Sequence, residues 1–150
     1  MQSTSSTTTK LFVILLIILG LLNIVQACAT GLLFDEAYYW YYAQQLEWGY
    51  FDHPPMVAWI IAGSSFIQGE LGVRLLFIAM HLGCIALLYD TLQIDTRVKP
   101  LYFLGLLLCF PLFQYYGFLA LPDSPFLFFT ALFFWAYRRF LRQELSLIHI

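Results

Sequence analysis

Long apolar runs constrain the fold of this chain more than any other feature of its sequence. Four such runs are Leu11–Ala29, Leu71–Leu92, Leu101–Leu121 and Phe126–Tyr137. A helix that crosses a bilayer needs about 20 mostly apolar residues, and the first three runs have this length. The fourth run reaches it only with Pro125 and the start of Arg138–Arg142, whose long side chains can extend toward the membrane surface. The sequence therefore predicts an all-α polytopic membrane protein with about four transmembrane helices.

The composition excludes the common soluble classes. Of the 150 residues, 61% are hydrophobic and 11% are charged, whereas soluble domains average about 45–50% apolar and about 25% charged residues. A disordered chain is excluded too, because disorder combines low hydrophobicity with high charge. The net charge of −2 gives no indication of a nucleic-acid partner, which requires a basic patch.

The distribution of charge between the runs predicts the orientation of the chain. With a cytoplasmic N-terminus, the inner side holds all Lys and Arg residues except Arg74, as the positive-inside rule requires. The outer acids are Asp35, Glu36, Glu47, Asp52, Glu70 and Asp123. We therefore expect a multi-pass plasma- or inner-membrane protein with cytoplasmic termini and a long outer loop over residues 30–70. Within this loop, Met56–Gln68 is too short to span and predicts an interfacial or re-entrant helix.

The ends of the chain leave alternatives open. We expect residues 1–10 to form a cytoplasmic tail, residues 11–144 to form the transmembrane part, and residues 145–150 to be a tail foreign to the protein. The first apolar run also fits a cleaved secretory signal peptide, since Lys10, Leu11–Leu22 and Ala27-Cys28-Ala29 follow its three-part pattern. An elaborate outer loop on so few spans further suggests that the chain is a fragment.

Asp35 and Glu36 open the outer loop directly after the first run. Eight aromatic residues follow within Tyr38–Phe51, and Tyr and Trp favour the membrane–water boundary. A helix that begins near Asp35 would place Asp35, Tyr39, Tyr42 and Leu46 on one face. Two interpretations of the acids stay open at this point: they are functional carboxylates, or they cap a surface helix.

The segment Asp52-His53-Pro54-Pro55 also has two interpretations. A carboxylate oxygen and an imidazole nitrogen held by a stiff turn are suitable ligands for a divalent cation. Two ligands are too few for a metal site, which would need further acids of the outer loops. In the alternative interpretation, Asp52 caps the helix that follows and the prolines begin it.

Asp123 lies in the short outer loop before the fourth run. Ser124 as a cap and Pro125 as the first helical residue explain most of this loop without Asp123. A carboxylate at this depth is costly unless it has a partner. Because the predicted topology puts Asp35, Asp52 and Asp123 on the same side of the membrane, we expect them to converge on one site.

Arg74 is the lone cation on the predicted outer side. It can extend to the interface or pair with Glu70, four residues earlier on a helix. Alternatively it binds an anion such as a lipid phosphate, for which the guanidinium fork has suitable geometry.

Four motifs in these segments carry a family resemblance. They are DEAYYW at 35–40, YFDHPPMVAW at 50–59, LGVRLL at 71–76 and LPDSPFLFF at 121–129. Together they resemble the N-terminal part of polytopic GT-C glycosyltransferases, within the family 39, protein-mannosyltransferase-like group, which is also similar to the aminoarabinose transferases of lipid A. Members of that family are several times longer than this chain.

The resemblance implies that a sugar is transferred from a polyprenyl-phosphate carrier to a lipid, glycan or protein acceptor on the extracytoplasmic face. The family's usual candidate base corresponds to Asp35. Asp52 is similar to an acid implicated in divalent-metal binding, and His53 beside it stands where many relatives carry Lys. The residues expected to bind substrate are Glu36, Tyr39, Arg74 and Asp123.

A function of another class stays open from the sequence. The chain could instead be a small four-span transporter or a membrane scaffold protein, with the acids as a cation path. That function predicts acids inside the spans, whereas the candidate acids lie in the outer loops.

Overall fold

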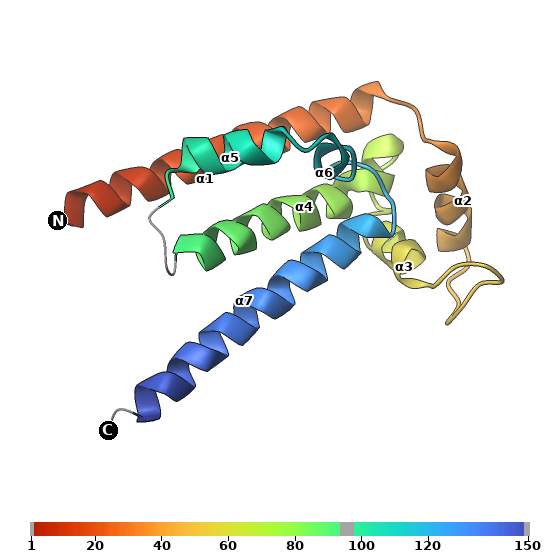
Figure 1. The fold of residues 1–150 in the computed structure, drawn as a ribbon. Helices are drawn as coiled ribbons and strands as arrows, with labels where there is room; N and C mark the ends of the chain where they lie inside the picture. The colour runs from red at the N-terminus through yellow and green to blue at the C-terminus, as the bar shows by residue number, and fades with distance from the viewer. Residues whose placement is uncertain (1, 94–97, 149–150) are drawn as a thin grey trace.

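The computed structural model describes residues 2–93 and 98–148, with side chains over 7–93 and 98–142. Those ranges are helical and contain no strand. The helices are α1 (Gln2–Ala29), α2 (Phe34–Ala43), α3 (Met56–Gly63), α4 (Glu70–Gln93), α5 (Pro100–Leu108), α6 (Pro111–Tyr115) and α7 (Asp123–Ile148) (Figure 1). The all-α fold predicted from the apolar runs is confirmed. Arg97 and the last two residues of the tail predicted at 145–150 lie outside the described ranges.

Helices α1 and α4 correspond to the first two predicted spans and lie side by side (Figure 1). Among the described residues, Thr7–Ala29 and Glu70–Gln93 are the segments long and apolar enough to cross a membrane. The two helices and α5 share a buried aromatic cluster, in which the Phe12 and Tyr89 rings stack with centroids 3.9 Å apart and Phe103 packs against both. This cluster holds the helices together far from the predicted outer loop.

The third apolar run does not form the single straight helix that its length predicts. Helix α5 ends at Leu108, and α6 begins only at Pro111. Proline lacks the N–H that would continue the helical ladder, and it disfavours a helical residue before it. Phe110 accordingly has φ −103° and ψ 93°. The run therefore forms two short helices and a connecting segment over residues 116–122.

Helix α7 is longer than the fourth predicted span and begins before it, at Asp123. It packs along α4 and slants away from the other helices toward the C-terminus (Figure 1). The predicted cap at Ser124 is wrong: its hydroxyl donates to the carbonyls of Tyr116 and Leu119 instead, and so fastens the connecting segment. Near the other end, Asp90 accepts hydrogen bonds from the Trp135 indole and from Arg139.

The predicted surface helix after the first span is α2, and the predicted interfacial helix at Met56 is α3. Helix α3 ends at Gly63, earlier than predicted, and a turn leads into α4. In that turn the Ser64 hydroxyl donates to the Gly72 carbonyl at 2.6 Å. A Cβ on Gly72 would lie 1.9 Å from the carbonyl oxygen of Ile67, so only glycine permits this close approach.

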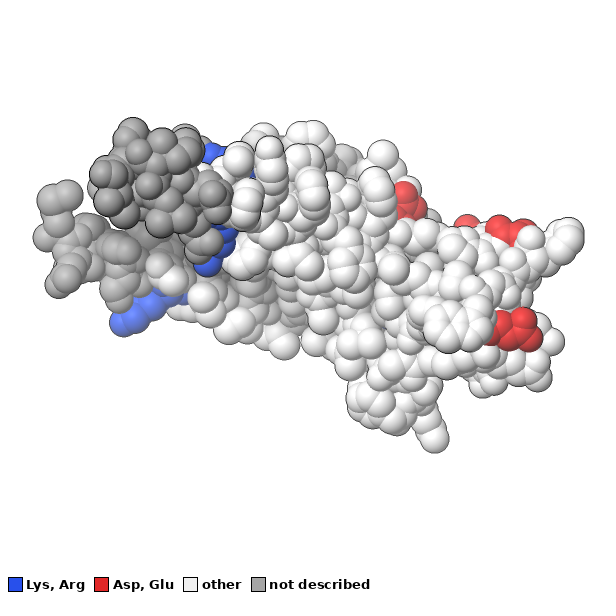
Figure 2. Space-filling model, turned by 90° about the horizontal axis from the view of Figure 1, so that it is seen from below, with Lys and Arg blue, Asp and Glu red and all other residues white. Residues whose placement is uncertain are grey.

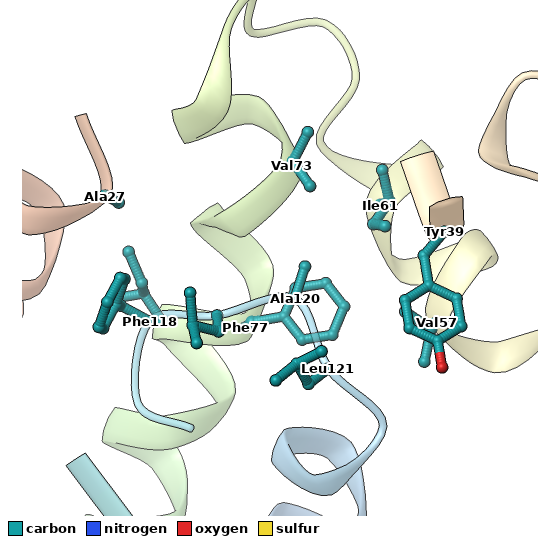
Figure 3. Packing of buried hydrophobic residues seen from close by; sticks show 11 residues of the cluster. Ala27, Tyr39, Val57, Ile61, Val73, Phe77, Phe118, Ala120 and Leu121 are labelled. Carbon is teal, nitrogen blue, oxygen red and sulfur yellow. The ribbon is translucent and has the colours of Figure 1, made fainter. Parts of the chain in front are cut away.

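A buried core fixes the outer loop onto the spans. Figure 3 shows Tyr39 of α2 together with Val57 and Ile61 of α3, near Val73 and Phe77 of α4. Phe118, Ala120 and Leu121 of the segment before α7 complete this cluster. With Ala27 of α1, residues from five parts of the chain therefore meet at the end of the bundle where α2 and α3 lie.

Most charged side chains separate between the two ends of the molecule, and the exceptions among the described side chains are Asp90, which pairs with Arg139, and the buried Arg74. Lys and Arg lie toward one end of the face in Figure 2, and Asp and Glu lie toward the opposite end. The described acids of the predicted outer loop are at the end that carries α2 and α3. The separation is the one that the positive-inside rule predicts, although the number of spans and their direction stay predictions.

Candidate active site

Glu36 and Arg74 form a buried ion pair at the N-terminus of α2. Arg74 Nη2 lies 2.6 Å from Glu36 Oε2, and Arg74 Nε donates to Glu36 Oε1 at 2.8 Å. Both side chains are 0% exposed. This bidentate geometry is the strongest form of an Arg–carboxylate contact. Of the alternatives that the sequence left open for Arg74, pairing with Glu70 is therefore wrong.

The rest of the Arg74 guanidinium binds the end of α1. Nη1 donates to the carbonyls of Ala27 and Thr30 and to the Thr30 hydroxyl, at 2.7–2.9 Å. Nη2 donates to the Gly31 carbonyl. The last carbonyls of a helix have no hydrogen-bond donors within the helix. Arg74 provides donors for these carbonyls at the end of α1. In this conformation no part of the guanidinium is open to a ligand.

The Glu36 carboxylate accepts two backbone N–H groups as well. The Leu33 N–H donates to Oε2, which caps α2, and the Ala120 N–H donates to Oε1 from the segment before α7. Burial raises the pKa of Glu36, but the bonds from Arg74, Ala120 and Leu33 and the charge of Arg74 outweigh it, so the net pKa is lowered. Glu36 stays ionised and, with Arg74, joins α1, α2, α4 and the segment before α7. In this conformation two of the four predicted substrate-binding residues, Glu36 and Arg74, are inside the protein.

Because Glu36 caps α2, its neighbour Asp35 is left free for another role. Asp35 is exposed in the first turn of the helix, and its carboxylate makes no hydrogen bond to the described residues. The interpretation that Asp35 caps the helix is therefore wrong. The Glu36–Arg74 pair fixes the backbone of the residue next to Asp35.

Asp52 is held by the hydroxyl groups of two tyrosines on α2. Tyr38 lies 3.1 Å from both carboxylate oxygens of Asp52, and the Tyr42 hydroxyl donates to Oδ1 at 2.9 Å. The neighbouring His53 ring and these hydroxyls lower the pKa of Asp52. Pro55, not Asp52, is the residue before α3, so the predicted capping role of Asp52 is wrong.

His53 lies between the carboxylate and the tyrosine rings. Its Nδ1 is 2.9 Å from Asp52 Oδ1, although the atoms are not aligned for a hydrogen bond. The imidazole packs edge-on against Tyr39 and Tyr38, with ring centroids 5.0 and 5.5 Å apart. The half-buried ring therefore forms a wall of the site next to Asp52.

Tyr39 lies at the point where the predicted acids converge. Its side chain is buried in the core beneath α2. Burial raises the pKa of Tyr39, and the charges of Asp35, Asp52 and Asp123 raise it further. The three carboxylates are thus close enough to act electrostatically on one hydroxyl. Asp123 itself is exposed in the first turn of α7.

An apolar groove of about 550 Å³ lies beside these acids, between α3 and α7. It begins next to His53 at Pro54 and next to Asp123 at Pro122, and continues along α7. The lining residues are Pro54, Met56, Val57, Pro122, Pro125, Phe126, Phe129, Thr130 and Phe133. A long apolar group could lie in this groove with a polar end near the carboxylates.

Metal-binding capacity is limited in the described part of the chain. No group of three or more His, Cys, Asp or Glu side chains there is arranged to hold a metal ion. Asp52 and His53 provide one carboxylate and one imidazole, as predicted from the sequence. Structural zinc sites use four protein ligands and catalytic sites usually three, so this pair alone does not complete a site of that kind.

The sequence did not predict that Tyr38 and Tyr42 belong to the site. Tyr38 and Tyr42 were grouped with the interfacial aromatics, but their hydroxyls bind Asp52. Their spacing of four residues on a helix was the available signal, since it puts both hydroxyls on one face. The groove on α7 was missed because an apolar face of a membrane helix normally contacts lipid.

Comparisons with known proteins found a family and a relative that this chain resembles. Residues 52–148, more than half of the chain, match the family model of the dolichyl-phosphate-mannose-protein mannosyltransferases. The lipid A galacturonosyltransferase RgtD of Rhizobium johnstonii is 36% identical over 66 residues, which cover 42% of this chain and 14% of that protein. The chain thus spans only a small part of the curated relative's length. No solved structure matches it. Since the family model extends from Asp52 through α7, the chain belongs to the dolichyl-phosphate-mannose-protein mannosyltransferase family.

Proposed function

We propose that this chain forms part of the active site of a membrane glycosyltransferase. The enzyme transfers a sugar from a polyprenyl-phosphate donor to a lipid, glycan or protein acceptor on the extracytoplasmic face. The observation that carries the proposal is the apolar groove that begins at Pro54 and Pro122, beside the Asp52-His53 turn and Asp123. Asp35 is near enough that its charge and those of Asp52 and Asp123 all raise the pKa of Tyr39. The family match supports the class of reaction.

The groove suits the apolar part of such a donor. Its walls are proline, phenylalanine and aliphatic side chains, and Thr130 supplies the hydroxyl group among them. Burying apolar surface is favourable by about 25 cal/mol per Å². A prenyl chain in the groove would place its phosphate and sugar near Asp52 and Asp123. Aromatic side chains on α2 would then border the sugar.

Asp35 is the proposed general base. An acceptor hydroxyl oxygen forms a bond to the anomeric carbon while the bond from that carbon to the phosphate oxygen breaks. The electron pair leaves with the prenyl phosphate, and the proton of the hydroxyl passes to the carboxylate. Asp35 is exposed and free of hydrogen bonds to the described residues, so it can accept that proton.

A divalent cation stays a prediction from the family resemblance. Asp52 and His53 would contribute two ligands, and other ligands would have to come from the substrate or from elsewhere in the protein. A bound cation would neutralise charge on the departing phosphate. The described residues do not complete such a site, and the proposed roles of Asp35 and the groove do not depend on it.

The direction of the chain in the membrane belongs to the same proposal. The acidic end with α2 and α3 would face the extracytoplasmic side, and the basic end would face the cytoplasm. A four-span transporter is less consistent with this structure, because Asp35, Asp52 and Asp123 lie at one end of the bundle rather than along α1 or α4.

The proposal is tested with the complete protein that carries this chain, reconstituted in lipid and supplied with polyprenyl-phosphate sugars. Lipid A-type acceptors are the first to try, because the relative RgtD is named for transfer to lipid A. We expect transfer by the wild-type protein and a loss of about 100-fold or more in kcat for Asp35→Asn, the usual size of a general-base effect.

Glu47→Gln is the matched control for Asp35→Asn. Glu47 is another exposed acid of the loop after α2, and it does not border the groove. We expect this variant to retain wild-type transfer. Full activity of Asp35→Asn would overturn the assignment of the base, and failure to use any prenyl-phosphate sugar would overturn the proposed reaction.

A further inference from the structure

The hydroxyls of Tyr38 and Tyr42 contact each other as well as Asp52. Their oxygens are 2.7 Å apart, and each lies within 3.1 Å of the Asp52 carboxylate. Each hydroxyl has a single proton. Each hydroxyl is therefore within reach to donate its proton to Asp52, and the Tyr42 hydroxyl also contacts the Tyr38 oxygen. Three oxygen-bearing side chains thus form one closed hydrogen-bonded group.

The loop that carries Asp52 is folded back onto α2 by a third tyrosine. The Tyr50 ring stacks on Tyr42 with centroids 4.0 Å apart and an interplanar angle of 18°. Its hydroxyl donates to the carbonyls of Tyr42 and Gln45. The Trp59 indole donates to the Glu47 carbonyl and so ties the same loop to α3. The loop backbone is therefore anchored at Glu47 and Tyr50, shortly before Asp52.

These anchors fix the backbone but leave the Asp52 side chain free to rotate. The carboxylate is 40% exposed, so water competes for its oxygens. Among the described residues, its hydrogen bonds come from Tyr38 and Tyr42. The hydroxyls of Tyr38 and Tyr42 lie on one face of α2 and both contact the Asp52 carboxylate. Unlike mobile water, two fixed donors hold this carboxylate in one rotamer.

We propose that Tyr38 and Tyr42 are positioning residues that hold the Asp52 carboxylate in the orientation the transferase site requires. The inference rests on the proposed function, because it assigns them a role through Asp52 in that reaction. Neither tyrosine needs to touch the substrate. Phenylalanine at either position keeps the ring packing, including the stack of residue 42 on Tyr50, and removes only the hydroxyl.

A double-mutant cycle in the complete protein tests this role. We expect Tyr38→Phe combined with Tyr42→Phe to lower kcat about tenfold or more, the size of a lost hydrogen bond to a charged group. The KM for the prenyl-phosphate sugar should change little. In an Asp52→Asn background, the same two substitutions should change kcat less than about twofold, because residues that act through a shared partner are not additive.

Tyr41→Phe is the matched control, since Tyr41 is on the same helix, is 69% exposed and has no hydrogen bond among the described contacts. We expect wild-type kcat for it. A kcat loss of equal size in the wild-type and Asp52→Asn backgrounds would overturn the positioning role. So would a wild-type kcat for the Tyr38→Phe and Tyr42→Phe pair.

A second measurement separates this inference from the proposed reaction. The χ1 rotamer of Asp52, followed by three-bond couplings in NMR spectra of the labelled protein, should be averaged in the Tyr38→Phe and Tyr42→Phe pair and single in the wild type and in Tyr41→Phe. If the wild-type protein transfers no sugar, the proposed function fails, and the rotamer measurement still tests the positioning of Asp52. A single Asp52 rotamer in the pair would overturn that positioning.

Discussion

Two carboxylates are held on different faces of α2, and the protein uses them in opposite ways. Glu36 has a side chain that is 0% exposed and is paired with the cation of Arg74. Asp52 has a side chain that is 40% exposed and is held by the neutral hydroxyls of Tyr38 and Tyr42. Both carboxyl groups have a lowered pKa, so both are ionised at neutral pH.

The difference in exposure and partner distinguishes a structural acid, which stabilises the fold, from an available acid, which can bind a substrate or a cation. A buried carboxylate needs a charge partner and a full set of hydrogen bonds, because its desolvation is otherwise too costly. A buried carboxylate whose oxygens are all hydrogen-bonded within the protein has no free oxygen to bind a ligand. An exposed carboxylate keeps water on part of its surface, and a substrate or a cation can replace that water. A lowered pKa alone does not distinguish the two cases, whereas exposure and the type of partner do.

The largest expected effect comes from breaking the buried pair. Glu36→Gln leaves the Arg74 guanidinium buried without its counter-charge, which costs about 3–5 kcal/mol in the free energy of unfolding. Chemical unfolding in detergent, followed by tryptophan fluorescence, measures this loss. Glu70→Gln is the matched control, because Glu70 lies on α4 one turn before Arg74 and forms no ion pair among the described residues. A small, equal effect of both substitutions would contradict the structural role of Glu36.

The pair also predicts how a second substitution behaves. Glu36→Leu combined with Arg74→Leu removes both charges, so no uncompensated ion remains in the interior. We expect this protein to be more stable than either single variant, although the N–H groups of Leu33 and Ala120 lose their acceptor. Simple addition of the two single losses would show that the residues act independently.

The sequence predicted much of the fold because helical spans leave a strong local signal. Helix α4 matches its apolar run closely, and α1 ends with its run at Ala29 but begins at Gln2, within the predicted tail. Helices α2 and α3 begin near Asp35 and Met56 as expected. The prediction of one long helix for the third run was wrong, because hydropathy does not report where the backbone can stay helical. Pro111 interrupts the helix there, although every neighbouring residue is apolar enough for a span.

The sequence predicted which acids belong to the candidate site, but it did not predict which residues bind those acids. Topology alone suggested that Asp35, Asp52 and Asp123 converge, and all three affect Tyr39. Glu70 was one of the partners considered for Arg74, because spacing along one helix is visible in a sequence. The actual partner is Glu36, 38 residues away, and only the tertiary fold, in which α2 packs on α3 and α3 packs on α4, brings the two together.

Acid pH should distinguish the two carboxylates as well. The pKa of Glu36 is lowered from 4.5, so Glu36 contributes its full stability above about that pH, and the contribution is lost as the pH falls through the lower folded pKa. We expect the free energy of unfolding of the wild-type protein to decline below pH 4.5. In Glu36→Gln this decline should be shallower, measured by chemical unfolding over a pH series. An identical pH slope in both proteins would mean that Glu36 is not ionised in the folded state.

The smallest expected effect on stability is that of Asp52→Asn at neutral pH. Asparagine has nearly the same size and can still accept a hydrogen bond from a tyrosine hydroxyl, and water screens the charge that is lost. We therefore expect the same unfolding midpoint as the wild type, in the assay that shows a large loss for Glu36→Gln. If Asp52→Asn also destabilised the protein strongly, Asp52 would be a second structural acid. Its exposure and its neutral partners would then no longer mark it as an available one, and the contrast between the two faces of α2 would fail.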